Sequence, residues 1–97
     1  MHDIDLTPEA AEDLATLRKF DQARVVDAIE NQLSHEPNTE TRNRKRLRPN
    51  RLAEWVLRVD EFRVFYDILA DSAVVKIVAI GNKEGNDLYI HGEKYEL

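Results

Sequence analysis

Positively charged residues are concentrated in one part of this chain, beside an apolar stretch that contains two further arginines. The apolar stretch is Trp55–Leu69 (WVLRVDEFRVFYDIL), and the two arginines inside it are Arg58 and Arg63. The segment before it has no acidic residue and holds Arg42, Arg44, Lys45, Arg46, Arg48 and Arg51. Arginine suits phosphate, because its planar guanidinium bonds two oxygens at once and keeps its charge. This pattern predicts binding to a phosphate group, or chemistry on one.

The charge of the chain is unevenly distributed. The net charge is −5, yet residues 42–51 carry +6, so the rest of the chain carries −11. A local field of this kind can steer an anion toward the basic segment while the acidic remainder repels it elsewhere. The alternative is a solvated surface loop whose arginines serve solubility only.

Composition limits the class of protein. A length of 97 residues predicts a single domain, residues 1–97, and 42% hydrophobic with 34% charged residues is typical of globular proteins. There is no cysteine, so neither disulfides nor thiolate metal sites are possible. The acidic amino terminus lacks the layout of a signal peptide, and no apolar run reaches the roughly 18 residues of a membrane span. We expect a soluble, cytoplasmic protein.

The first third of the chain predicts a strand and two helices. His2–Leu6 alternates between apolar and acidic residues, as in a half-buried strand. Thr7 precedes a proline and can cap a helix that runs to about Lys19. Asp21 is the predicted cap of a second, amphipathic helix that runs to about Ser34. Because so few residues link the helices, we expect an antiparallel helical pair.

The remainder predicts a sheet. Residues 36–52 lack periodicity and are expected to form one long loop, anchored by Leu47 and Leu52. Strands are expected at Ala53–Val59, Phe62–Leu69 and Val74–Ile80, the last ended by Gly81-Asn82. Residues 88–90 fit either a short strand or a helical turn. The predicted fold class is α+β: an N-terminal strand and an antiparallel helical hairpin packed on a mainly antiparallel sheet of about four strands.

The order of these elements, together with the hairpin sequence, resembles the RelE/ParE superfamily of bacterial type II toxins. The pattern aromatic-x-Leu-Arg-x-x-x-aromatic-Arg-x-x-Tyr is met by Trp55, Leu57, Arg58, Phe62, Arg63 and Tyr66. Members of the RelE branch cut messenger RNA on the ribosome, and members of the ParE branch poison DNA gyrase. Each is held inactive by a cognate antitoxin. The resemblance therefore implies a RelE-like fold, a cytoplasmic toxin and an antitoxin partner.

The RelE branch implies a metal-independent endoribonuclease without a cofactor, in which the ribose 2′-hydroxyl attacks the neighbouring phosphate. Arg63 matches the arginine that stabilises the phosphate, unless it pairs instead with Asp67 or Glu61. Lys83 stands where these enzymes carry a second functional arginine. Tyr89 matches a late tyrosine that stacks on a base or aids proton transfer, although a tyrosine here also suits a core position.

The first hairpin strand departs from the RelE pattern. Glu54 and Val56 occupy the positions of two lysines. Glu54 is a candidate base, provided that arginines of the neighbouring loop offset its repulsion of phosphate. His91 is a second acid–base candidate, since histidine titrates near neutrality. The histidines are not spaced as metal ligands, and we expect no metal site.

RNA or ribosome contacts are expected from the basic residues of the loop and of the first hairpin strand. These are Arg42, Arg44, Lys45, Arg46, Arg48, Arg51 and Arg58. The alternative function is a toxin fold that does not cut RNA, either a ParE-like gyrase inhibitor or a catalytically degenerate binding module. Loss of the strand lysines favours this alternative, and retention of Arg63 beside the basic run opposes it.

Overall fold

The computed structural model describes residues 1–69 and 71–96. The described elements follow the order β1 (Asp3–Leu6), α1 (Pro8–Ala15), α2 (Lys19–Leu33), β2 (Arg44–Arg46), β3 (Trp55–Val59), β4 (Phe62–Leu69), β5 (Val74–Glu84), β6 (Asp87–Ile90) and β7 (Glu93–Tyr95). Within the described part of the chain, no helix is both long and apolar enough to cross a membrane.

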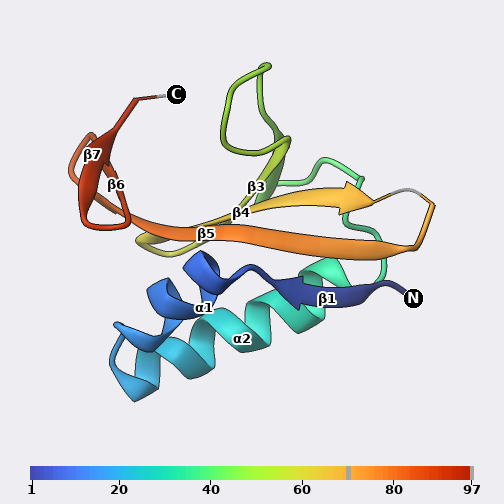
Figure 1. Ribbon diagram of the computed structural model, residues 1–97, viewed down its shortest axis with the longest axis horizontal. Helices are drawn as coiled ribbons and strands as arrows, with labels where there is room; N and C mark the ends of the chain where they lie inside the picture. The colour runs from blue at the N-terminus through green and yellow to red at the C-terminus, as the bar shows by residue number, and fades with distance from the viewer. Residues whose placement is uncertain (70, 97) are drawn as a thin grey trace.

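One sheet contains all seven strands that the described residues form. Strands β2 to β7 are neighbours in chain order and antiparallel, and β1 pairs in parallel with the first half of β5. The two helices and β1 lie on one side of the long β4–β5 pair (Figure 1). The predicted α+β class is confirmed, with seven strands in the described ranges rather than about four.

The helix-covered face of the sheet holds the larger core. Side chains alternate along a strand, so Leu57 of β3 and Val64 of β4 point to the same side and pack with Val25 and Leu33 of α2; all four are fully buried. Tyr66 of β4 is also fully buried, and its hydroxyl donates to the carbonyl of Pro37 at 2.7 Å. Burial raises the pKa of this tyrosine.

Two predicted helix boundaries are wrong. The first helix ends at Ala15 instead of near Lys19, because the Thr16 backbone N–H and hydroxyl both bond carbonyls of the last turn. Asp21 does not cap the second helix, which begins at Lys19; it lies buried in the first turn, where its carboxylate meets Arg18 at 3.3 Å. The positive end of the helix dipole favours a carboxylate there.

The predicted sheet also needs correction in its second half. Residues 36–52 are not one loop, because they contain β2. Gly81-Asn82 does not end the central strand, which continues to Glu84. Glycine is required inside the strand, since a Cβ at Gly81 would lie 2.5 Å from the Tyr89 carbonyl oxygen. Residues 88–90 belong to a strand, β6, and the sequence pattern does not predict the strand that follows it, β7.

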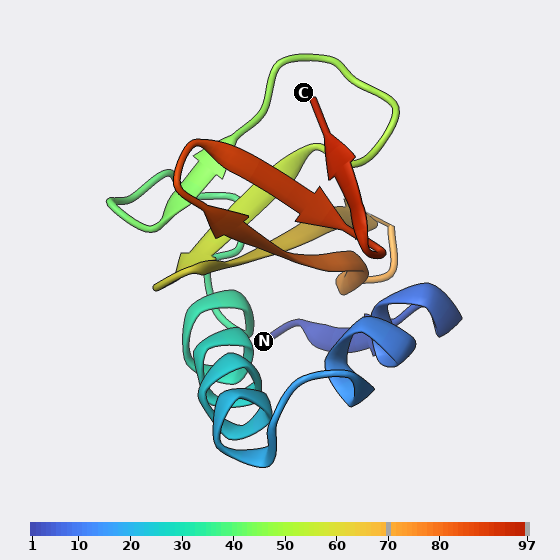
Figure 2. The ribbon, with the colours of Figure 1, turned by 90° about the vertical axis from the view of Figure 1, so that its left-hand side faces the viewer.

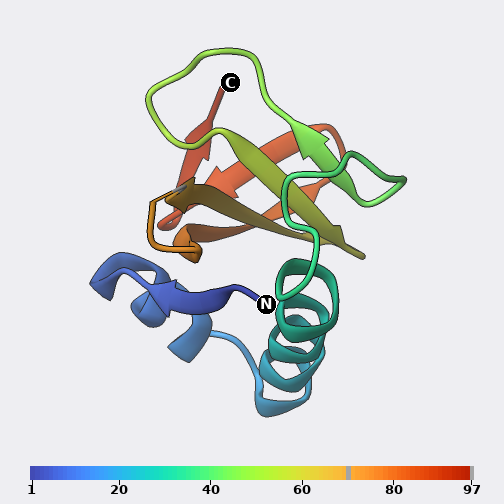
Figure 3. The ribbon, with the colours of Figure 1, turned by 90° about the vertical axis from the view of Figure 1, so that its right-hand side faces the viewer.

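The opposite face of the sheet carries a smaller apolar cluster, centred on Val56, Phe65, Ala79 and Ile90. The β6–β7 hairpin rises on this side of the sheet, and its turn comes down toward α1 (Figure 2). The loop between β2 and β3 also extends away from the helices (Figure 3). The predicted anchors of that loop, Leu47 and Leu52, are confirmed, because both pack against this cluster.

Candidate functional site

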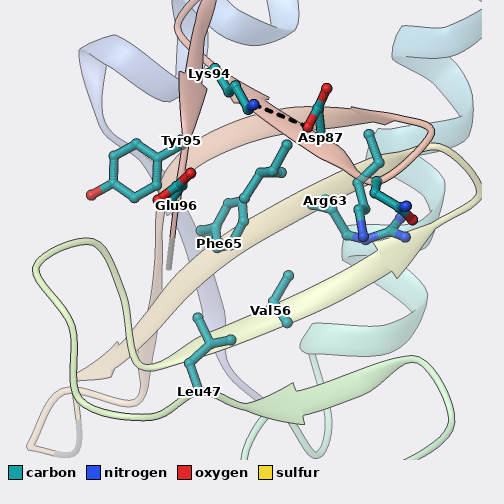
Figure 4. A pocket seen from close by; sticks show the side chains of 11 residues that line it. Leu47, Val56, Arg63, Phe65, Asp87, Lys94, Tyr95 and Glu96 are labelled. Carbon is teal, nitrogen blue, oxygen red and sulfur yellow. Dashed lines mark ion pairs between the residues drawn. The ribbon is translucent and has the colours of Figure 1, made fainter.

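An open cavity of about 550 Å³ lies on the face of the sheet that the helices leave uncovered (Figure 4). Its lining comes from the end of β2, from β3, β4 and β5, and from the C-terminal hairpin. The lining residues are Leu47, Val56, Arg63, Phe65, Lys83, Asn86, Asp87, Leu88, Lys94, Tyr95 and Glu96. Of the five predicted catalytic residues, the structure brings two together here, Arg63 and Lys83.

Arg63 is held in the cavity by the backbone. Its Nη1 donates to the carbonyl oxygens of Asp60 at 2.7 Å and of Phe62 at 2.8 Å. Neither predicted ion-pair partner takes it: the Asp67 carboxylate accepts the Glu54 backbone N–H, and the Glu61 carboxylate pairs with a helix arginine. Across the described ranges, Arg63 forms no ion pair. Its remaining N–H donors are therefore available to an anion.

The electrostatic surroundings of Arg63 also favour an anion. Burial lowers the pKa of its guanidinium, and the positive charge of Arg58 lowers the pKa further. The two arginines are directly opposed in the β3–β4 register. Like charges in this position repel each other. A bound phosphate would offset that repulsion, because it brings negative charge to both cations.

Lys83 adds a second cation to the cavity. Gly81 is the register partner of Arg63, and Lys83 follows on the same face of β5 two residues later. Lys83 and Arg63 are thus diagonal cross-strand neighbours, within reach of long side chains. The backbone N–H of Lys83 donates to the Glu61 carbonyl at 2.7 Å, which keeps β5 against the start of β4.

The floor and wall of the cavity have different chemistry. Val56 and Phe65 form an apolar floor from β3 and β4 (Figure 4). The wall includes Tyr95 and Glu96 of the C-terminal segment, which the sequence analysis missed. The detectable signal was the short polar–aromatic alternation at the end of the chain. In the β6–β7 pair, Tyr95 lies opposite Leu88, and this register turns the tyrosine toward the apolar cluster.

Tyr89 and His91 lie outside this cavity. Leu88 and Ile90 face the apolar cluster, so alternation turns Tyr89 to the other side of β6. His91 has a positive φ of 55° and meets the buried Asp13 of α1, with 2.8 Å between its Nδ1 and Oδ1. The other Asp13 oxygen accepts the Ile80 backbone N–H at 3.0 Å. This contact ties the C-terminal hairpin to the helices.

Glu54 lies in a second hollow, formed by the loop between β2 and β3. This hollow has a volume of about 420 Å³. It is lined by Arg46, Leu47, Arg48, Pro49, Asn50, Arg51, Leu52, Ala53, Glu54 and Asp67. Arg46 meets the Glu54 carboxylate at 3.7 Å and lies over the ring of Trp55. The expected compensation of Glu54 by a loop arginine is thus present, but away from Arg63 and Lys83.

The predicted RNA-contacting residues divide into two groups. Arg44 is buried, and its guanidinium donates to the carbonyls of Gln32 and Thr39, so it does not belong to an exposed basic surface. The exposed members are Arg42, Lys45, Arg46, Arg48, Arg51 and Arg58. Over residues 1–69 and 71–96, no group of three or more His, Asp or Glu side chains is arranged to hold a metal ion.

Comparisons with known proteins place this geometry in context. A family model described as "ParE toxin of type II toxin-antitoxin system, parDE" matches residues 4–86. A chain of the solved toxin–antitoxin complex RelBE2 from Mycobacterium tuberculosis is similar at 27% identity, with a TM-score of 0.73. That match covers 84% of this chain and 98% of the other. No curated protein sequence matches.

Proposed function

Since the chain belongs to the ParE toxin family of type II toxin–antitoxin systems, we propose that it is a toxin that cleaves ribosome-bound messenger RNA. The RelBE2 relative was solved as a toxin–antitoxin complex, which supports a protein antitoxin as the partner that restrains it. The observation that carries the proposal is Arg63, a cation that two backbone carbonyls hold in an open cavity and that lies opposite another cation, Arg58, across the β3–β4 pair.

The proposed reaction is attack by a ribose 2′-hydroxyl on the adjacent phosphorus, which forms a 2′,3′-cyclic phosphate and breaks the bond from phosphorus to the 5′-oxygen. The departing 5′-oxygen takes a proton from solvent water and leaves as a hydroxyl. Arg63 binds the phosphate through its free N–H donors and stabilises the charge that builds up on it, with Lys83 as the second cation. Because the guanidinium is already held in place, little reorganisation is needed when charge develops. The half-buried ring of Tyr95 in the cavity wall offers a surface on which a base can stack.

A carboxylate in the same cavity completes the proposal. Two carboxylates line it, and Asp87 already pairs with Lys94 at 3.3 Å (Figure 4). We assign Glu96 as the acceptor of the 2′-hydroxyl proton, in place of Glu54, Tyr89 and His91.

Expression without an antitoxin in a bacterial host tests the proposed activity. The expected result is growth arrest with new 5′ ends inside translated messages. Arg63→Ala should lower cleavage by about 10²–10³-fold, the usual cost of losing one positioned donor. Arg63→Lys should restore little, because lysine lacks the bidentate fork. Lys76→Ala is the matched control, an exposed cation of β5 outside the cavity. Growth unaffected by induction of the wild-type protein would refute any toxin function.

Purified variants test the proton acceptor. Glu96→Gln should reduce single-turnover cleavage by about 10²-fold or more, with affinity for an uncleavable substrate retained. Glu93→Gln, an exposed carboxylate of β7, should cleave like the wild type. If Glu54→Gln reduces cleavage and Glu96→Gln does not, the assignment of the acceptor is wrong.

One observation favours a second candidate, a toxin that inhibits DNA gyrase without cutting RNA. The matching family model is described as a ParE toxin and ends at residue 86, before the residues of the cavity wall. Growth arrest with intact messages and an induced DNA-damage response would favour this candidate over the nuclease.

A further inference from the structure

We infer that the arginine loop between β2 and β3 is a second phosphate subsite, joined to the Arg63–Lys83 cavity, and that the substrate is an extended single strand that spans both. The loop comprises residues 47–54, and Arg48 and Arg51 are the cations that it presents. Asn50 is the residue that positions them. This inference rests on the proposed action on RNA and adds the length and path of the bound strand.

The loop has a fixed conformation that depends on one side chain. The Asn50 amide nitrogen donates to the carbonyls of Arg48 at 2.7 Å and Ala53 at 2.9 Å. The amide oxygen accepts the backbone N–H groups of Leu52 at 2.7 Å and Ala53 at 3.0 Å. These bonds use both N–H donors and both lone pairs of the amide. Asn50 thus organises the backbone that carries Arg48 and Arg51.

The charges in the loop are not equally available. Arg46 is engaged by Glu54 and by the ring of Trp55. Arg48 and Arg51 are exposed and form no ion pair within the described part of the chain. A loop held in one conformation with two such arginines loses little entropy when it binds an anion.

The two hollows adjoin at one residue. Leu47 lines both the Arg63–Lys83 cavity and the hollow of the loop. Its backbone N–H donates to the Glu54 carbonyl at 2.8 Å, which closes the base of the loop. A polyanion bound at Arg63 can therefore continue over Leu47 to Arg48 and Arg51. The proposed path predicts that a mononucleotide or dinucleotide bound at Arg63 does not reach the loop.

Binding of uncleavable 2′-O-methyl oligoribonucleotides to the full-length protein tests this path. A dodecanucleotide should bind at least about tenfold tighter than a dinucleotide, the size of one added charge-assisted contact. The double variant Arg48→Ala/Arg51→Ala should lose that gain and keep its affinity for the dinucleotide. Its plot of log affinity against log salt should be shallower by about 1.4, since a single strand loses roughly 0.7 per phosphate contact.

A matched double variant and the positioning residue complete the test. Lys19→Ala/Lys76→Ala removes two exposed charges outside both hollows and should leave both affinities near those of the wild type. Asn50→Ala should weaken dodecanucleotide binding alone, whereas general loss of structure would weaken the dinucleotide as well. The inference is overturned if the dodecanucleotide gains nothing, or if the loop variants keep the gain. Cleavage of ordinary RNA is measured in parallel: if it is absent while the length effect holds, the nuclease proposal fails and the subsite stands.

Discussion

Arg44 on the helix-covered face of the sheet and Arg63 on the uncovered face differ in burial and in their hydrogen-bond partners. On the helix-covered side, Arg44 is buried and donates to the carbonyls of Gln32 and Thr39. On the uncovered side, Arg63 donates to carbonyls of its own hairpin and lies opposite Arg58. Gln32 lies in the last turn of α2, where unpaired carbonyls form the negative end of the helix dipole. The hydrogen bonds of Arg44 stabilise the fold, whereas Arg63 retains N–H donors that can bind a ligand.

The burial and the hydrogen-bond partners of a charged side chain indicate whether it stabilises the fold or can bind a ligand. A buried charge must be paired or hydrogen-bonded, because desolvation without a partner costs several kcal/mol. Arg44 satisfies this rule. Arg63 is only partly buried and lies beside a like charge, which lowers its pKa. Such an arrangement disfavours the empty site and favours the anion-bound site.

The largest effect is expected on the uncovered face, from Lys83→Ala. Loss of the second cation should lower single-turnover cleavage by about 10²–10³-fold, because it contributes to stabilising the transition-state charge. The free energy of unfolding should change little, since Lys83 forms no ion pair among the described residues. Lys83→Arg should retain most of the activity. Unchanged cleavage by Lys83→Ala would break the comparison, since both faces would then carry charges without a catalytic role.

The opposite outcome is expected for Arg44→Met on the helix-covered face. Removing the guanidinium leaves the carbonyls of Gln32 and Thr39 without their donor, and should lower the free energy of unfolding by about 1.5–3 kcal/mol. Urea denaturation measures this loss. Arg42→Met, at a neighbouring exposed position, is the matched control and should stay within about 0.5 kcal/mol of the wild type. A salt dependence of RNA binding that changes for Arg44→Met alone would mean that Arg44 contacts RNA.

Arg44 and Arg63 show which features of the structure can be predicted from the sequence and which cannot. Periodicity predicts the strands and helices, because the apolar residues that form the core also set the period. Arg44 and Arg63 cannot be told apart in this way, since the partner of Arg44 is the end of a helix twelve residues earlier. That contact depends on where the chain returns after α2.

The C-terminal hairpin was the least predictable part of the site. Tyr89 lies between two apolar residues and Tyr95 between two charged residues, yet the strand register turns Tyr95, and not Tyr89, toward the cavity. A shift of one residue in that register would exchange the two faces. The glycine at position 81 favours a wrong prediction of the strand end. Its absence of a side chain leaves room for the carbonyl of Tyr89, and the strand continues through it.

A smaller loss of stability is expected from Asp13→Ala, which removes a contact from the helix side to the cavity wall. The variant leaves the buried Ile80 N–H without its acceptor and frees His91, so the free energy of unfolding should fall by about 1–2 kcal/mol. Asp13→Asn keeps an acceptor and should lose less. Glu12→Ala, an exposed neighbour, is the control. Amide hydrogen exchange should rise at residues 87–96 in Asp13→Ala; unchanged exchange there would mean that the wall does not depend on α1.

The smallest effect, and one of opposite sign, is expected from Arg58→Gln. The pKa of Arg63 is lower in the folded protein than in the unfolded chain, so its charge disfavours folding at any pH at which it is protonated, neutral pH included. Removing the opposed charge of Arg58 should therefore raise the free energy of unfolding by a few tenths of a kcal/mol, about the size of a cross-strand charge effect. Thermal unfolding in low salt measures this difference, and added phosphate should narrow it, because a bound anion already relieves the repulsion in the wild type. Sodium chloride at equal ionic strength is the control for screening. If Arg58→Gln is less stable than the wild type in low salt, the Arg58–Arg63 pair stabilises the fold. The repulsion between the two arginines then does not favour binding of an anion.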